Sequence, residues 1–298
     1  MDSANRQKRF ISVIFLGLVM WWLVVNVFFD ASVIWHALWT GLYGVIAIGG
    51  GIFGLLSARV WGGWKTAMGK AIIFFSVGLL SQEFGQVAYS YSIYFKQIEL
   101  PYPSIGEIGY FSSIPLYVMG IFYFAKSVVK GGLLKLPMRL KIFLIIFPLL
   151  FLAAALPVVT RVYNSSANSW LAVLLAVGYV LGGAFYVSLS AFVYLFAREK
   201  MIGIFDKISL KIFLALTIQC LADLVFLYQF NEKTWVTAGI NDLMYLLAYY
   251  GLAVGLLDLR LIFENLQIVS GRNCEPRNYF QIDDLKSLSK KLLILKNT

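Results

Sequence analysis

The sequence predicts an all-α integral membrane protein, a polytopic bundle of eight transmembrane helices. Of the 298 residues, 60% are apolar and only 13% are charged, whereas soluble domains are roughly 45–50% apolar and about 25% charged. The chain also contains eight runs of about 20 mostly apolar residues, the length that a helix needs to cross roughly 30 Å of hydrocarbon. These runs are 10–29, 36–58, 68–94, 105–125, 141–160, 169–196, 208–230 and 238–260.

Positive charge predicts the orientation of the bundle, because Lys and Arg collect in cytoplasmic loops. Of the 25 lysines and arginines, 22 lie in the N-terminal segment, in alternate loops and in the C-terminal segment; only Lys96, Arg161 and Lys233 lie on the other side. We therefore expect a multi-pass protein of the inner (plasma) membrane with both termini in the cytoplasm. The net charge of +10 is dispersed over short loops and does not form one basic patch. We therefore expect the protein to contact the lipid bilayer and not to bind nucleic acid.

The first four and the last four spans resemble two copies of one unit. The matching positions are mostly polar, aromatic or glycine: Gln82, Gln86 and Tyr91 match Gln219, Asp223 and Tyr228, and Ile105, Glu107, Tyr110 and Gly120 match Ile240, Asp242, Tyr245 and Gly255. Because each unit crosses the membrane an even number of times, the two copies enter it in the same direction and form a parallel repeat. We expect residues 1–130 and 131–260 to be the two four-helix repeats and 261–298 a cytoplasmic amphipathic basic tail.

The second span contains a glycine run and is flanked by tryptophans. Small residues let helices approach closely in lipid, so residues 49–51 predict a packing face; a flexible hinge is the alternative. Trp and Tyr are enriched where a membrane meets water. We therefore place four tryptophans at the two interfaces: Trp35, Trp39, Trp61 and Trp64.

Polar side chains recur at membrane depth in the third and seventh spans. Four of them fall on one side of the third helix, and two in the seventh span are spaced four residues apart: Gln82, Glu83, Gln86 and Tyr89, then Gln219 and Asp223. A charged side chain facing lipid costs roughly 2.5–3.5 kcal/mol, so such residues face the bundle interior. There they could hold a cation, share a proton or bind a polar ligand. The alternative is structural: they hydrogen-bond each other and neighbouring helices.

The fourth and eighth spans each begin with an acid. Pro101 and Pro103 end the third span, and Ser104 and Glu107 then have the spacing of a capping box, in which the Glu side chain reaches back to the start of its own helix. Asp242 is also favoured at a helix N-terminus by the helix dipole. A ligand role at an outward-facing polar cup stands beside these structural roles. The candidate ligand-binding residues are Gln82, Glu83, Gln86, Tyr89, Glu107, Tyr110, Gln219, Asp223, Asp242 and Tyr245.

The C-terminal segment has a different character from the spans. After a break at residues 271–276, leucines recur at helical spacing with lysines between them: Leu285, Leu288, Leu292 and Leu295. This pattern predicts a short basic amphipathic helix on the inner leaflet, and the alternative is a helix that binds a cytoplasmic partner protein or forms a homodimer. Cys220 and Cys274 lie in different environments, so no disulfide is expected.

Residues 101–111, PYPSIGEIGYF, followed by Pro115 and Gly120, resemble the multi-span membrane regions at the N-terminus of bacterial GGDEF-type diguanylate cyclases and related signalling proteins. The resemblance covers about fifty residues from Ser81 onward, and the second repeat echoes it more weakly. It implies a sensory input module. The chain departs from the pattern in two ways: Glu107 stands where the pattern has Asp, and only a 38-residue tail follows the last span, so no output domain is expected.

Motifs that support an enzymatic function are missing from the sequence. We find no zincin helix, phosphate loop, nucleophile elbow or Cys/His cluster, so catalytic residues, a metal site and a cofactor are not expected. The last span has no lysine that could bind retinal. The first hypothesis is a sensory module that binds a small ligand or proton in its polar cup and signals through the tail. The alternative is a small secondary transporter with a cation- or proton-coupled site at the repeat interface, and a structural role is the fallback.

Overall fold

The computed structural model describes residues 2–28, 33–96, 103–128, 138–165, 170–200 and 204–270. Within these ranges the backbone is helical apart from short turns. Among the described residues, eight segments are long and apolar enough to cross a membrane, which agrees with the predicted number of spans. The elements are α1 (Asp2–Phe28), α2 (Val33–Leu42), α3 (Val45–Val60), a 3-10 turn η1 (Gly63–Lys65), α4 (Ala67–Tyr94), α5 (Gly106–Val128), α6 (Met138–Ser165), α7 (Trp170–Lys200), α8 (Ile204–Glu232) and α9 (Ile240–Ser270).

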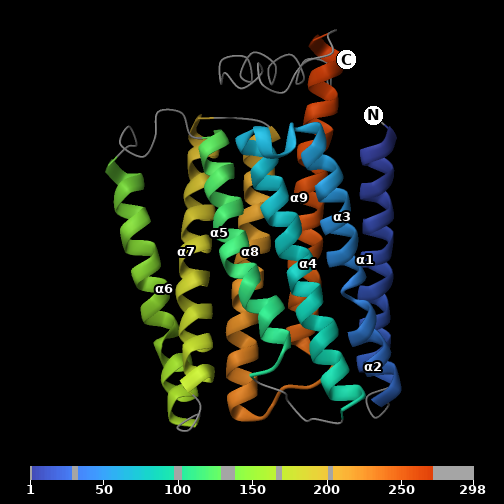
Figure 1. Cartoon of the computed structure of the whole chain (residues 1–298), viewed down its shortest axis with the longest axis vertical. Coiled ribbons are helices and arrows are strands. Elements are labelled where there is room, and N and C mark those ends of the chain that lie inside the picture. Colours follow the sequence, from blue (N-terminus) through green and yellow to red (C-terminus); the bar gives the residue numbers. More distant parts are fainter. Residues whose placement is uncertain are drawn as a thin grey trace.

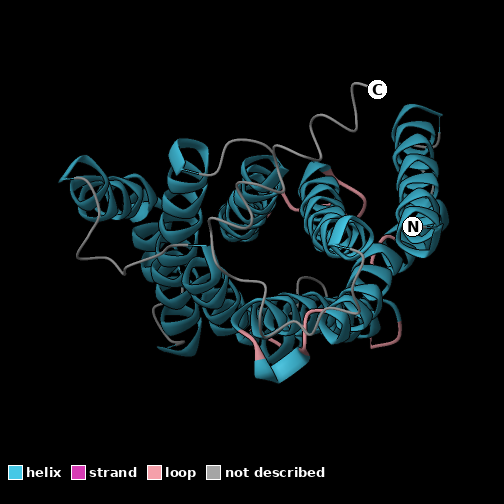
Figure 2. Ribbon diagram, turned by 90° about the horizontal axis from the view of Figure 1, so that it is seen from above, coloured by secondary structure: helices cyan, strands magenta, loops and turns pink. Residues whose placement is uncertain are grey.

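The helices run side by side along the long axis of the molecule, with α1 and α6 at opposite edges (Figures 1 and 2). Within the membrane-spanning part of α9, 72% is buried, compared with 17% in α1 and 6% in α6. α9 is therefore the central helix, and it packs against α1, α3 and α8. The start of α1 and the end of α9 lie at one end of the bundle, and the first turns of α5 and α9 lie at the other (Figure 1).

The predicted span 36–58 is interrupted and is not one continuous helix. A turn at Tyr43 and Gly44 separates α2 from α3, and the amide of Ile46 donates to the Tyr43 carbonyl at 3.3 Å, the three-residue spacing of a tighter turn. The turn lies against α4. A Cβ atom on Gly44 would fall 1.6 Å from Oε2 of Glu83, so glycine at this position makes room for the carboxyl.

The last helix is longer than predicted. α9 continues to Ser270, so residues 261–270, which were expected to begin the tail, belong to the helix. No Gly or Pro occurs in this stretch to end the helix earlier. Residues 271–298, with the predicted amphipathic segment, lie outside the described residues.

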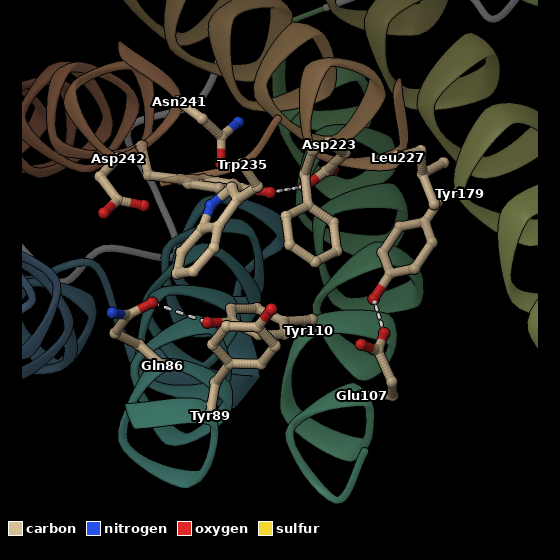
Figure 3. A pocket seen from close by; sticks show the side chains of 12 residues that line it. Gln86, Tyr89, Glu107, Tyr110, Tyr179, Asp223, Leu227, Trp235, Asn241 and Asp242 are labelled. Atoms are coloured by element: carbon tan, nitrogen blue, oxygen red, sulfur yellow. Dashed lines mark hydrogen bonds between the residues drawn. The ribbon is translucent and has the colours of Figure 1, made fainter. Parts of the chain in front are cut away.

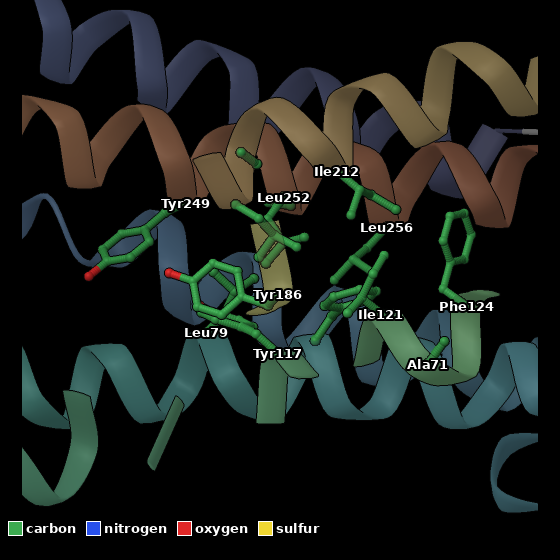
Figure 4. Packing of buried hydrophobic residues seen from close by; sticks show 14 of the residues in the cluster. Ala71, Leu79, Tyr117, Ile121, Phe124, Tyr186, Ile212, Tyr249, Leu252 and Leu256 are labelled. Atoms are coloured by element: carbon green, nitrogen blue, oxygen red, sulfur yellow. The ribbon is translucent and has the colours of Figure 1, made fainter. Parts of the chain in front are cut away.

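Aromatic side chains and close backbone contacts fill the interior. Tyr117 and Tyr186 meet edge to face at 6.0 Å between ring centroids, and Tyr249 lies on the same buried cluster (Figure 4). A Cβ atom on Gly50 would lie 2.6 Å from that of Ala253, so the glycine run brings α3 close to α9. The packing role predicted for this run is confirmed.

Two tryptophans predicted to lie at the membrane interface are fully buried. Nε1 of Trp39 donates to the carbonyl of Leu18 at 2.8 Å, and Nε1 of Trp61 donates to that of Leu259 at 3.1 Å. A buried indole requires an acceptor, and these two find theirs on α1 and α9. Trp39 and Trp61 therefore do not present their rings at the protein surface as belt residues would: they tie the interrupted span to two neighbouring helices.

Candidate ligand-binding cavity

A cavity lies between α4, α5, α7, α8 and α9 (Figure 3). It includes residues of the first turns of α5 and α9, which lie at the end of the bundle opposite the termini (Figure 1). It offers about 30 Å³ to the centres of water-sized molecules, and one water needs roughly 10–15 Å³ by this measure. The cavity can therefore hold a few waters or a small molecule. It is lined by Gln86, Tyr89, Glu107, Tyr110, Tyr179, Asp223, Phe226, Leu227, Trp235, Asn241, Asp242 and Tyr245.

Gln86 on α4 joins three segments at one edge of the cavity. Its Oε1 accepts from the Tyr110 hydroxyl at 2.7 Å and from the Tyr43 hydroxyl at 2.9 Å, and its Nε2 donates to the Thr40 carbonyl at 3.2 Å. These bonds satisfy both ends of a buried amide, as a polar group inside a bundle requires. The amide of Gln86 is consequently held by the bundle even without a ligand.

Glycines set the distance between α4 and α5 beside this amide. A Cβ atom on Gly109 would fall 2.4 Å from the backbone nitrogen of Gly85, and a Cβ atom on Gly85 would fall 2.8 Å from the Tyr110 ring. Only residues without a Cβ permit this approach, a common feature of helix packing in membranes. The local sequence therefore positions Tyr110 over α4, within reach of Gln86.

Glu107, in the first turn of α5, faces α7. Its Oε2 accepts from the Tyr179 hydroxyl at 2.5 Å (Figure 3). The predicted capping box forms only in part: Oγ of Ser104 accepts from the Gly106 amide at 3.1 Å. The expectation that the Glu107 carboxyl caps its own helix is wrong, because α7 presents a tyrosine hydroxyl to it.

Asp223 on α8 is hydrogen-bonded to side chains of α8 and α9. Its Oδ1 accepts from the Tyr245 hydroxyl at 2.9 Å and from Nε2 of Gln219 at 3.2 Å. Asp223 is 7% exposed, and Oε1 of Gln219 is buried with no hydrogen-bond partner in the described ranges. The Asp223 carboxyl therefore faces the cavity from α8, oriented by a tyrosine of α9.

Asp242 lies in the first turn of α9. Its Oδ2 accepts from the Ala238 amide at 2.9 Å and from the Thr40 hydroxyl at 3.4 Å. Ala238 has φ of 55°, a left-handed conformation that is uncommon for a residue other than glycine. Its carbonyl accepts from Trp22 at 2.7 Å and Asn26 at 3.2 Å, both on α1. Asp242 thus also organises the turn that enters α9.

Three predicted site residues do not line the cavity. Gln82 donates from Nε2 to Ser113 at 2.6 Å, and its Oε1 accepts from Tyr249 at 3.3 Å. Glu83 lies against the turn between α2 and α3, and Gln219 supports Asp223 from behind. The other seven predicted residues lie around the cavity. The helical spacing placed Gln82 and Glu83 on the correct, buried side of α4, but the cavity occupies only part of that side.

Five lining residues were not predicted: Tyr179, Phe226, Leu227, Trp235 and Asn241. Asn241 is a polar residue next to the predicted site residue Asp242, and Trp235 is an aromatic residue in a polar turn between two spans. Both could have been identified from the sequence. Tyr179, Phe226 and Leu227 lie in apolar runs in which nothing marks them.

Two polar atoms at the cavity have no hydrogen-bond partner among the residues that the structure describes. They are the Tyr89 hydroxyl and Oδ1 of Asn241, both buried, and the residues are 5% and 2% exposed. Nearly all buried polar atoms in proteins are hydrogen-bonded, so each of these needs an explanation. A ligand or ordered water in the cavity would supply the missing bonds.

The cavity combines three carboxyl groups with aromatic walls, and none of its described lining residues is Lys, Arg or His. Among the described residues, no group of three or more His, Cys, Asp or Glu side chains is arranged so that it could hold a metal ion. The arrangement is suited to binding a small molecule. Comparisons of this chain with protein-family models, with curated proteins and with solved structures found no match.

Proposed function

We propose that this protein is a sensory module of the inner membrane, in which a small ligand binds in the cavity and α9 transmits its presence to the cytoplasm. The observation that carries the proposal is the course of α9. This helix supplies Asn241, Asp242 and Tyr245 to the cavity, crosses the bundle as its most buried helix and reaches the opposite end at Ser270. A change at the cavity therefore acts directly on the helix that precedes the C-terminal tail.

At the end of α9 farthest from the cavity, polar side chains bond residues of other helices. Asp258 forms ion pairs with Lys8 of α1, at 2.6 Å, and with Lys211 of α8. Arg260 donates to Gln7 of α1 at 3.2 Å, while its bond to Glu264 at 2.8 Å lies within α9 and holds its guanidinium in place. These contacts form a set of polar links that a shift or rotation of α9 would strain or exchange, as a two-state switch requires.

The orientation in this proposal follows from charge. Because 22 of the 25 lysines and arginines occur on the side of the termini, that side is proposed to be cytoplasmic. The cavity then opens toward the outside, and residues 261–298 face a cytoplasmic partner. The resemblance of residues 81–120 to membrane sensor regions of diguanylate cyclases supports the same reading.

We also propose that the two halves are a parallel repeat. The helix pairing supports this: α3 of the first half packs against α9, the last helix of the second, and α7 of the second half packs against α5, the last helix of the first. The matched residues also make matching bonds. Tyr110 donates to Gln86 in one half, and Tyr245 donates to Asp223 in the other. The cavity lies between these two equivalent pairs.

A secondary transporter remains the second candidate because of the interrupted span. Transporters place coupling ions beside broken helices near the interface of their repeats. Glu83 lies against the break between α2 and α3 and is 8% exposed, and its Oε2 has no hydrogen-bond partner among the described residues. An acid in this position is suited to carrying a proton or cation.

A cysteine placed in the cavity separates the two functions. Leu227 lines the cavity and is 1% exposed, so Leu227→Cys, with Cys220 and Cys274 replaced by alanine, reports access to it. A sensor should react with a small membrane-impermeant thiosulfonate from the outer face of intact cells only. A transporter should also react from the cytoplasmic face in inverted vesicles. Leu252→Cys, buried in the core away from the cavity, is the unreactive control.

The same modified cysteine tests transmission. Once the reagent occupies the cavity, amide hydrogen exchange in residues 258–270 of α9 should change relative to the unmodified protein. A cavity that is labelled from outside while this segment exchanges at an unchanged rate would contradict a sensory function. Labelling from neither face would contradict a ligand-binding cavity altogether.

A further inference from the structure

We propose that the ligand of this cavity is a small organic ammonium ion, an inference that rests on the proposed ligand-binding function and specifies its chemistry. Three carboxyl groups, of Glu107, Asp223 and Asp242, line the cavity, and none of them forms an ion pair with a described residue. Buried acids are normally paired with a charge, and at this site the protein supplies none among the residues described. A cationic ligand would complete the site.

The hydrogen bonds within the site leave acceptors free. Each carboxyl accepts a protein hydrogen bond at one oxygen: from Tyr179 at Glu107, from Tyr245 at Asp223 and from the Ala238 amide at Asp242. The second oxygen of each carboxyl receives none from the described residues. Within the described part of the chain, Oδ1 of Asn241 also receives no hydrogen bond, while its Nδ2 donates to the Ala222 carbonyl at 2.7 Å. The Tyr89 hydroxyl is one donor still available at the site, but the free acceptors outnumber it, and the N–H groups of an ammonium ion supply further donors.

Aromatic rings form walls at right angles to one another around this site. The Tyr89 ring meets Phe226 at 5.9 Å and 80° between ring planes. It meets Trp235 at 5.7 Å and 85° (Figure 3). Tyr110, Tyr179 and Tyr245 line the remaining sides. Cations are attracted to the faces of aromatic rings, and cages of this kind bind alkylammonium groups.

The geometry favours an organic cation over a metal ion. Ca²⁺ and Mg²⁺ require six or more oxygen ligands within about 2.6 Å of one point, whereas no three acids of the described chain are arranged to share an ion. The carboxyl groups instead lie on α5, α8 and α9, around the rim of an aromatic space. An ammonium group with short alkyl substituents matches charges that are spread in this way.

Charge selectivity can be tested with probes of equal shape. We would measure binding to the purified full chain by thermal stability and tryptophan fluorescence, using ethanolammonium and choline as cations. The controls are 3,3-dimethylbutan-1-ol, the neutral isostere of choline, and the anion 3,3-dimethylbutanoate. At least one cation should bind tenfold or more tightly than the neutral isostere, and the anion should bind least.

Variants locate the binding in the cavity. Asp223→Asn should weaken binding of the cation at least tenfold, whereas Glu232→Gln, which removes the same charge from an exposed position on the same helix, should leave it unchanged. Trp235→Leu should weaken it about three- to thirtyfold by removing one aromatic wall. This variant tests the same site if Asp223→Asn fails to fold.

The outcomes separate this inference from the proposed function. If the neutral isostere or the anion binds as tightly as the cations, or if neither cation binds the folded native chain, the ammonium assignment is overturned. The cysteine experiments at Leu227 would still decide whether the cavity is a sensor site. Conversely, cations that bind and depend on Asp223, without any change in exchange at the end of α9, would support the ligand class and overturn the sensory function.

Discussion

Tyrosine hydroxyls hold two of the acids that face the cavity. Tyr179 orients Glu107 and Tyr245 orients Asp223, each from a different helix. Because these bonds lie in a buried region, losing the donor leaves a carboxyl oxygen with fewer partners, which destabilises the fold and loosens the site at once. Individual side chains at this site therefore contribute to both stability and binding.

Replacing Tyr245 by Phe tests this dual role. Tyr245→Phe keeps the ring and removes the donor to Asp223, so we expect the free energy of unfolding to fall by about 1 kcal/mol. Thermal or denaturant unfolding of the purified protein measures the change. Tyr163→Phe, at a tyrosine that is 65% exposed on α6, is the matched control and should be neutral. Equal stability of the two variants would contradict the role given to this bond.

The second residue-scale prediction concerns the close contact between Gly44 and Glu83. A methyl group at residue 44 would overlap the far end of the Glu83 side chain, which must turn aside, so Gly44→Ala should destabilise the protein by about 1 kcal/mol. Gly41→Ala on α2, where a Cβ atom meets nothing within 4 Å, is the control and should have little effect.

A double mutant assigns the cause of that loss. If the overlap is responsible, adding Glu83→Ala to Gly44→Ala should recover much of the lost stability, and the two changes should be strongly non-additive. Additive effects, measured by the same unfolding assay, would show that Gly44 is required for the turn itself.

At the scale of whole elements, helices differ sharply in how much protein surrounds them. In the membrane-spanning part of α9, 72% is buried, compared with 6% in that of α6, which packs mainly against α7 and α8 among the described helices. In lipid, an exposed apolar side chain exchanges one apolar neighbour for another, whereas a buried one loses its packing contacts when it is truncated. The same substitution should therefore have different consequences on these two helices.

Leucine truncations test the difference. Leu246→Ala on α9 removes a side chain that is 0% exposed and should cost about 2 kcal/mol or more, through the void that it leaves. Leu149→Ala on α6 removes one that is 59% exposed and should change stability by less than about 0.5 kcal/mol. A large loss at Leu149 would instead indicate that α6 is covered by a partner in the folded protein.

For the whole molecule, the strongest expectation is its orientation in the membrane. Thr234→Cys, in the turn between α8 and α9, should react with a membrane-impermeant maleimide in intact cells, because few positive charges occur on that side. Lys207→Cys, near the start of α8, should react only after the membrane is permeabilised. Both positions are exposed, so the reverse pattern would contradict the orientation and not merely report poor access.

The sequence was informative about which residues are polar inside the membrane, and less so about their partners. Helical spacing correctly placed Gln82, Glu83 and Gln86 on the buried side of α4. That side contacts more than one neighbour, so only Gln86 reaches the cavity, while Gln82 bonds α5 and Glu83 meets the break in the second span. The spacing of residues along one helix does not predict which of these partners each side chain contacts, because it gives no information about where the adjacent helices lie.

The sequence alone determined that this chain has eight segments able to span a membrane. Each backbone in lipid must satisfy its own hydrogen bonds within a helix, so the number of spans follows from local apolar length. Tertiary packing decided that Trp39 is buried, that Glu107 bonds α7 instead of capping α5, and that residues from five helices surround one cavity. These features depend on contacts between segments far apart in the chain, which no local pattern encodes.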